Sequence, residues 1–204
     1  MNSLNEHFDS YFKKVSETLG EVDIDSIYSA IDKILECYNK GNTIYIFGNG
    51  GSASTASHVA GDFMKGISFG LDKRFKVICL NDNIPAITAI SNDLTYEEVF
   101  YEQLKTFLKK DDIVIGISGS GNSANVIKAL NHAKDLGSTV IALCGFEGGK
   151  IKKIADILVH APINDMEITE DIHIIILHAV KQLINKRIKG EKYSMGANYD
   201  KRVE

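Results

Sequence analysis

Five short apolar runs, separated by segments with helical spacing of apolar residues, constrain the fold of this chain more than any other feature. The runs are apolar almost throughout, as in strands that are buried on both faces of a sheet. Their alternation with helices predicts an α/β protein with a doubly wound, five-stranded parallel sheet, covered by helices on both faces. The five runs are residues 43–47, 75–80, 112–117, 139–144 and 156–160.

The helical segments divide the chain into layers. Two amphipathic helices precede the first strand and form an N-terminal helical layer over residues 1–40, with an apolar face of the kind that often forms an oligomer interface. The α/β core follows over residues 43–188, so we expect a single domain at 1–188 and a polar tail at 189–204. We expect the helices of the core at 52–66, 84–91, 96–108, 123–136 and, as one long final helix, 167–188.

Charge and cysteine content exclude several classes of protein. The net charge of −4 and pI near 5.9 argue against a general nucleic-acid or membrane-surface binder. No segment reaches the roughly 18–20 continuous apolar residues of a membrane span, and the chain starts without a basic, apolar leader. Three widely spaced cysteines are typical of reduced thiols. We therefore expect a cytoplasmic protein with no membrane or nucleic-acid partner.

A glycine-rich turn follows the first strand and leads into a helix. It reads Gly48-Asn49-Gly50-Gly51-Ser52, and a strand, a glycine turn and a helix together direct backbone N–H groups at an anion. His58 and Asp62 are four residues apart on the emerging helix and share one face. We expect the turn to hold a phosphate while these two side chains face the reacting end of the ligand.

A second polar turn, Ser118-Gly119-Ser120-Gly121-Asn122-Ser123, follows the third strand. Its hydroxyls at a helix start would surround a phosphate with uncharged donors; alternatively, the turn is flexible and Ser123 is only an N-cap. Ligands of doubly wound sheets bind beyond the carboxyl ends of the strands, so both turns should be neighbours. Neither turn contains the Gly-Lys-Ser/Thr of a Walker loop or a dinucleotide fingerprint.

The final helix carries an acid and two histidines in apolar surroundings. Glu170 and His178 follow one ridge of the helix, about 12 Å apart along its axis at 1.5 Å per residue. They can serve one site only if the ligand or metal lies between them or if they serve different subunits. His173 and His178 are either core histidines or part of a divalent-metal or acid/base site. His7, His132 and His160 stand alone and suit surface or core roles.

These residues resemble the SIS (sugar isomerase) domain family and, within it, the sedoheptulose 7-phosphate (phosphoheptose) isomerases. The resemblance spans about residues 1–188 and rests on both glycine turns, on His58 and Asp62, on Ile90-Ser91-Asn92-Asp93, and on Glu170 through His178. It implies a flavodoxin-like three-layer sandwich and a homotetramer with sites between subunits.

The resemblance also implies roles for individual residues. Zinc would be bound by His58, Asp62, Glu170 and His178, and we expect His178 with Asp62 or Glu170 to be the catalytic acid/base groups. The phosphate would be held by Ser118, Gly119, Ser120 and Ser123. The first glycine turn would then hold the sugar itself instead of the phosphate. Further contacts to the substrate would come from Asn49, Gly50, Gly51, Ser52, Asn92, Asp93 and Glu170.

Three positions depart from the common pattern of the family. Asp62 stands where the family usually has Glu, Glu170 where it has Gln, and Gly119 where it has Thr. Two histidines and two carboxylates form a hard, anionic set suited to a divalent metal. The departures leave open which carboxylate acts on the substrate, and how the phosphate is held.

The function that we expect is an aldose–ketose isomerase. It would convert sedoheptulose 7-phosphate to D-glycero-D-manno-heptose 7-phosphate for lipopolysaccharide or capsule heptose. Two alternatives remain: a non-catalytic phosphosugar-binding protein of the same family, acting as a sensor or as a partner of the replication initiator, and an isomerase of another sugar phosphate.

Overall fold

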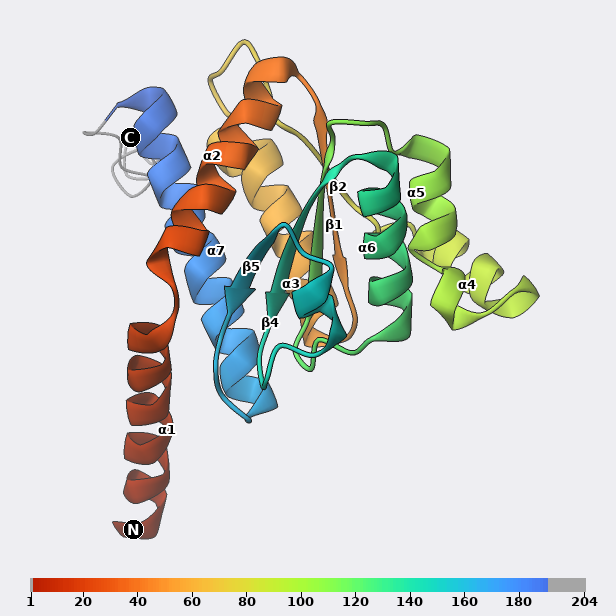
Figure 1. Ribbon diagram of the computed structural model, residues 1–204. Coiled ribbons are helices and arrows are strands. Elements are labelled where there is room, and N and C mark those ends of the chain that lie inside the picture. The colour runs from red at the N-terminus through yellow and green to blue at the C-terminus, as the bar shows by residue number, and fades with distance from the viewer. Residues whose placement is uncertain (1, 191–204) are drawn as a thin grey trace.

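The computed structural model describes residues 2–190 and contains one five-stranded parallel sheet (Figure 1). The strand order is β2-β1-β3-β4-β5, which confirms the predicted doubly wound α/β fold. The order reverses between β1 and β3, and ligands of such sheets bind where the strand order reverses. The strands are β1 (Thr43–Gly48), β2 (Lys76–Cys79), β3 (Ile113–Ser118), β4 (Thr139–Cys144) and β5 (Ile157–His160).

Helices cover both faces of the sheet. One face packs under α2, α3 and α7, and the other under α4, α5 and α6 (Figure 1). Each face has its own apolar core, because the buried strand residues alternate between the two sides. The α-helices are α1 (Asn2–Glu21), α2 (Ile24–Lys40), α3 (Gly51–Gly61), α4 (Ile84–Asp93), α5 (Tyr101–Phe107), α6 (Ala124–Leu136) and α7 (Met166–Lys189).

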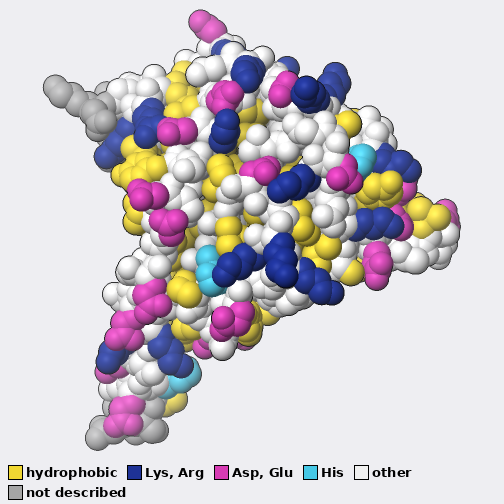
Figure 2. Space-filling view, in the orientation of Figure 1, with side chains coloured by type: hydrophobic (Ala, Val, Ile, Leu, Met, Phe, Trp, Pro, Cys, Tyr) yellow, Lys and Arg dark blue, Asp and Glu magenta, His cyan; other side chains and the backbone are white. Residues whose placement is uncertain are grey.

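The first helix extends beyond the sheet instead of packing along it. Figures 1 and 2 show α1 projecting from the body of the molecule, with acidic side chains on the face toward the viewer. Its apolar residues Leu4, Phe8 and Phe12 are exposed. The hydroxyl of Tyr11 donates to Asp171 Oδ2 at the start of α7, over 2.7 Å. The predicted N-terminal layer therefore contacts α7 yet leaves an apolar stripe in solvent.

Two predicted helices differ from the structure. The helix predicted over 52–66 ends as an α-helix at Gly61 and continues as a π-helix, η1 (Asp62–Ile67). The helix predicted over 96–108 is broken into a 3₁₀ turn, η2 (Tyr96–Glu98), and the separate helix α5. A further 3₁₀ turn, η3 (Lys150–Lys153), follows β4. π-helices are rare in proteins, and those that occur often lie at functional sites. The π-helix η1 begins at Asp62, which is one of the predicted site residues.

Within residues 2–190, no helix is long and apolar enough to cross a bilayer. Cys37, Cys79 and Cys144 are buried and unpaired, as expected of reduced thiols. The predicted tail lies outside the described residues, except that Lys189 is the last residue of α7 and Gly190 its cap.

Candidate active site

The two polar turns meet at the point where the strand order reverses. Gly48 at the end of β1 pairs with Ile117 near the end of β3. Beyond this pair, Asn49 and Asn125 exchange two hydrogen bonds, each Nδ2 donating to the other residue's Oδ1 at 2.9 Å. The predicted proximity of the two turns is therefore confirmed.

A tyrosine completes this amide pair. The hydroxyl of Tyr96 donates to Asn49 Oδ1 over 2.8 Å, so the amide that we predicted to touch substrate is also tied to two protein groups. Tyr96 and Asn125 were not predicted as site residues. The place of Asn125, two residues beyond the serine turn, is a sequence signal that could have indicated it.

The serine turn presents hydroxyls at the start of α6. Ser118 Oγ and Ser123 Oγ lie 3.0 Å apart, and Ser120 Oγ accepts from the Asn122 N–H. Ser123 occupies the N-cap position, but its side chain makes no capping bond. The hydroxyl is therefore not used as a simple cap, and the Val126 N–H in the first turn of this 13-residue helix donates to Asn125 Oδ1 instead. This arrangement suits an anion such as a phosphate.

His58, Asp62 and His178 form a compact cluster where α3 and η1 pack on α7. The Nε2 atoms of the two histidines lie 2.8 Å apart. Asp62 Oδ2 lies 3.5 Å from His58 Nε2 and 3.8 Å from His178 Nε2. The spacing of four residues, from α3 into the first residue of η1, places His58 and Asp62 on one face, as predicted, and α7 supplies His178.

This cluster fits a divalent metal. The three ligand atoms all lie within 4.8 Å of one another. Two imidazole nitrogens and a carboxylate oxygen are ligands that zinc accepts, and three protein ligands leave a fourth position for water or substrate. Asp62 Oδ2 is buried without a hydrogen-bond partner among the described residues. Because an orphaned buried carboxylate oxygen is costly, a cation bound between it and the histidines would satisfy it.

Glu170 lines the same pocket but is not a member of the three-residue group. The pocket has a volume of about 340 Å³ and lies between α3 and α7. The Glu170 carboxylate lies against Gly51, where a Cβ atom would come 2.1 Å from Oε2. Desolvation raises the pKa of Glu170, and the negative charges of the nearby Glu167 and Asp171 raise it further. The pocket is lined by Gly51, Ser54, Thr55, His58, Glu170, Asp171, Ile174 and His178.

The two histidines of α7 have different environments. His173 is buried, and neither ring nitrogen has a hydrogen-bond partner among residues 2–190. Burial lowers its pKa to about 4, so it is a neutral core histidine. His178 is half-exposed in the pocket. His173 therefore fits the interpretation as a core histidine, and the role of His178 in a metal or acid/base site stays a prediction.

The predicted pair Asn92 and Asp93 lies elsewhere. Both are exposed at the end of α4, and Asn92 Nδ2 donates to Asp93 Oδ1 over 2.8 Å. Neither residue lines the pocket between α3 and α7. Their contact with substrate stays a prediction.

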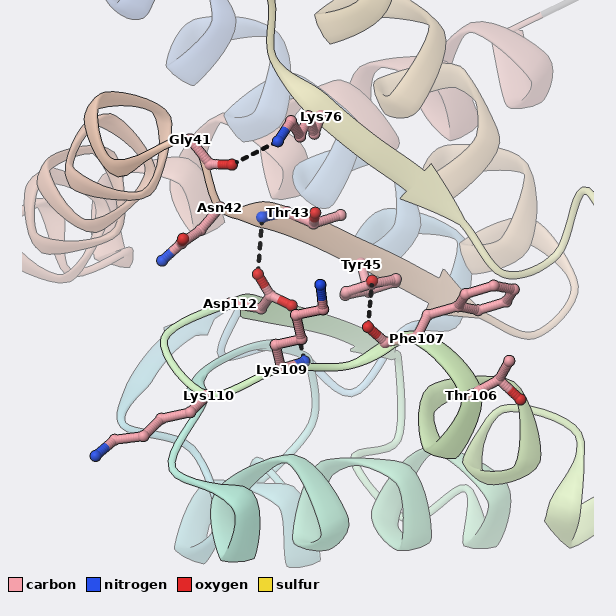
Figure 3. A pocket seen from close by; sticks show the side chains of 10 residues that line it. All are labelled: Gly41, Asn42, Thr43, Tyr45, Lys76, Thr106, Phe107, Lys109, Lys110 and Asp112. Carbon is pink, nitrogen blue, oxygen red and sulfur yellow. Dashed lines mark hydrogen bonds between the residues drawn. The ribbon is translucent and has the colours of Figure 1, made fainter.

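A larger cavity, of about 520 Å³, lies at the opposite, amino end of the strands (Figure 3). Its polar groups mostly pair with one another. Asp112 accepts from the backbone N–H groups of Thr43 and Lys109, and Tyr45 donates to the Phe107 carbonyl. It contains none of the predicted site residues, so we place the chemistry in the smaller pocket.

Comparison with known proteins identifies the family of the chain. The SIS domain family profile matches residues 7–145. Phosphoheptose isomerase from Clostridium acetobutylicum is 36% identical over 170 residues, covering 83% of this chain and 86% of that protein. The chain belongs to the SIS domain family. Phosphoheptose isomerase from Helicobacter pylori strain P12 is 39% identical over 175 residues, covering 85% of this chain and 88% of that protein.

The fold of this SIS domain protein also agrees with that of a solved relative. The structure of phosphoheptose isomerase from Neisseria gonorrhoeae superimposes with a TM-score of 0.82 at 30% identity, covering 91% of this chain and 98% of that one. Within the SIS family, the chain is thus grouped with the phosphoheptose isomerases by sequence and by fold.

One departure from the SIS pattern has a structural counterpart. A Cβ atom at Gly119 would lie 2.5 Å from Met166 Sδ. Met166, the first residue of α7, therefore occupies the space that a threonine at position 119 would need.

Proposed function

We propose that this protein is an aldose–ketose isomerase that converts sedoheptulose 7-phosphate to D-glycero-D-manno-heptose 7-phosphate. The observation that carries the proposal is the cluster of His58, Asp62 and His178, of which the two histidines line a pocket. The chain that carries this cluster matches phosphoheptose isomerases over most of its length. The serine turn adds a phosphate-binding arrangement beyond the neighbouring strand.

The reaction moves a proton between C1 and C2 of the sugar and needs an acid/base group and a stabilised enediolate. The half-exposed imidazole of His178 can take the proton in the pocket. Asp62 or Glu170 is the second acid/base group. The pKa of Glu170 is raised toward the neutral range, which suits a group that exchanges a proton at neutral pH. A bound zinc ion would polarise the carbonyl and hydroxyl oxygens.

Phosphate binding would position the reacting carbons. Ser118, Ser120 and Ser123 present hydroxyls at the start of α6, and the remote phosphate would fix the sugar chain between this turn and the pocket. Binding energy from a non-reacting group is then used for orientation. Asn49 and Gly51 are the residues that we expect along the sugar.

Assembly into a homotetramer belongs to the same proposal. The exposed apolar residues Leu4, Phe8 and Phe12 of α1 would be covered by other subunits. The bond from Tyr11 to Asp171 ties α1 to a residue that lines the pocket, so assembly and site would be linked. We propose zinc as the metal, the cytoplasm as the compartment, and lipopolysaccharide or capsule heptose as the destination of the product.

A substrate panel tests this function. The zinc-loaded protein is incubated with sedoheptulose 7-phosphate, and with pentose and hexose ketose phosphates, and aldose products are followed by NMR. We expect turnover of the seven-carbon substrate alone. Turnover of a shorter sugar would change the substrate, and binding without turnover of any sugar would favour a phosphosugar sensor.

A further inference from the structure

Lys181 follows His178 by three residues on α7 and reaches Asp62 in the cluster. Its ammonium donates a hydrogen bond to Asp62 Oδ1. Both side chains are only 17% exposed, so this ion pair is largely shielded from solvent. The Lys181 side chain passes close to Gly66 in η1, where a Cβ atom would lie 3.0 Å from Lys181 Cε. The absence of a side chain at Gly66 therefore leaves space for Lys181.

The two oxygens of Asp62 have different surroundings. Oδ1 is bound by Lys181, whereas Oδ2 is turned toward His58 and His178 at 3.5 and 3.8 Å and is buried without a hydrogen-bond partner among the described residues. Because Lys181 occupies Oδ1, only Oδ2 of this carboxylate is left to bind a metal ion between the two histidines.

The charge of Lys181 acts against a metal at that position. Partners that accept a hydrogen bond from a metal ligand make the ligand more basic and strengthen metal binding. An ammonium that donates to the ligand does the opposite, and it repels the divalent cation across a poorly solvated gap. In the absence of a metal, the same ammonium neutralises a carboxylate that would otherwise be buried and unpaired.

We propose that the ammonium group of Lys181 pairs with the Asp62 carboxylate in the metal-free protein and, by its positive charge, lowers the affinity of the site for divalent metal ions. The inference rests on the proposed metal site at His58, Asp62 and His178. Lys181 is thus a positioning residue, acting through Asp62 rather than on the substrate.

Zinc affinity, measured by chelator competition, tests the proposal. We compare the wild type with Lys181→Met, Asp62→Asn and the double variant. Lys181→Met should bind zinc at least tenfold more tightly, and the gain should vanish in the Asp62→Asn background. Lys134→Met, which removes an exposed partner of Asp156, is the matched control and should leave the affinity unchanged. Unchanged or weaker binding by Lys181→Met overturns the proposal, as does an equal gain without Asp62.

Thermal unfolding gives a second measurement. The metal-free Lys181→Met protein should melt below the wild type, because Asp62 loses its partner, and added zinc should raise its melting temperature by more than that of the wild type. Should Lys181→Met fail to fold, Lys181→Gln, which keeps a donor but removes the charge, replaces it, with the same tighter zinc binding expected.

The same titrations separate this inference from the proposed function. Zinc binding by the wild type with no change in Lys181→Met removes only the role of Lys181. Zinc binding by Lys181→Met but not by the wild type supports that role and removes zinc from the proposed function. Binding by neither protein overturns both.

Discussion

The Nε2 atoms of His58 and His178 lie 2.8 Å apart, although 120 residues separate them in the chain. They meet because α3 and α7 pack side by side on one face of the sheet. With Asp62 beside them, they form the group on which the proposed chemistry depends.

Replacing His178 with alanine should abolish most of the turnover. The imidazole is the proposed proton acceptor, and removing a general base lowers kcat by about 10²–10⁴-fold. Binding of the sugar phosphate should persist, because the serine turn is untouched. The measurement is kcat from the aldose assay together with calorimetric binding. His132→Ala, on α6 across the sheet, should retain activity; an unchanged kcat in His178→Ala would remove this residue from the mechanism.

Gly119 and Met166 should behave as a coupled pair. Gly119→Thr forces its new side chain against Met166 Sδ, and overpacking costs about 1–3 kcal/mol of unfolding free energy. The cost should fall at the low end, since Met166 is 40% exposed and its end is flexible. In the Met166→Ala background, the same substitution should cost less. Chemical denaturation of both single variants and the double variant measures this coupling, and additive costs would show that Met166 does not fill the space.

Asn49→Ala should loosen the carboxyl end of β1. It leaves the buried Asn125 Nδ2 without its partner, and an unsatisfied buried polar group costs about 1–3 kcal/mol. The Tyr96 hydroxyl also loses its partner, but Tyr96 is 54% exposed and its hydroxyl can bind water instead. We expect a lower free energy of unfolding together with a raised KM. Asn39→Ala, at an exposed position of α2, serves as a control for the loss of an amide. A variant that is as stable as the wild type would show that the amide pair contributes nothing to the fold.

His173 should make stability depend on pH. Burial lowers its pKa to about 4, from the ordinary 6.5. As the pH falls below about 6.5, the unfolded chain gains a proton at this residue that the folded chain rejects, so stability is lost between about pH 6.5 and 4, by at most about 3 kcal/mol. Denaturation at pH 7 and pH 5 measures this loss. His173→Leu should lose less stability between these two pH values, and an equal loss would assign the effect to other groups.

Much of the fold follows from local sequence. The apolar runs predicted the five strands, because strands buried on both faces need them, and the glycine turns indicated where a ligand site would form. The π-helix at Asp62 was missed because no helix breaker lies between Ser52 and Ala60, and Gly61 and Gly66 do not distinguish a π-helix from a continued α-helix. The π-helix lies where α7 packs against it. The break before α5 was missed for a similar reason, since apolar spacing continues across it.

The site was predictable in part for the same reason. His58 and Asp62 are four residues apart, from α3 into the start of η1, so their spacing places them together. The strand ends place the two turns together. The pairing of Lys181 with Asp62 and the contact of Met166 with Gly119 depend on how α7 is rotated against the sheet. Spacing within one segment carries no information about such a rotation, so neither contact could be predicted.

The most direct test of the account is NMR of the zinc-loaded protein with sedoheptulose 7-phosphate in deuterated water. Isomerisation through an enediolate with acid/base groups in the pocket predicts new aldose signals, with deuterium at C2 of the product. Loss of both in His178→Ala would assign the proton transfer to the His58–Asp62–His178 cluster. Sugar phosphate that binds but shows neither new signals nor deuterium in the wild type would contradict the account.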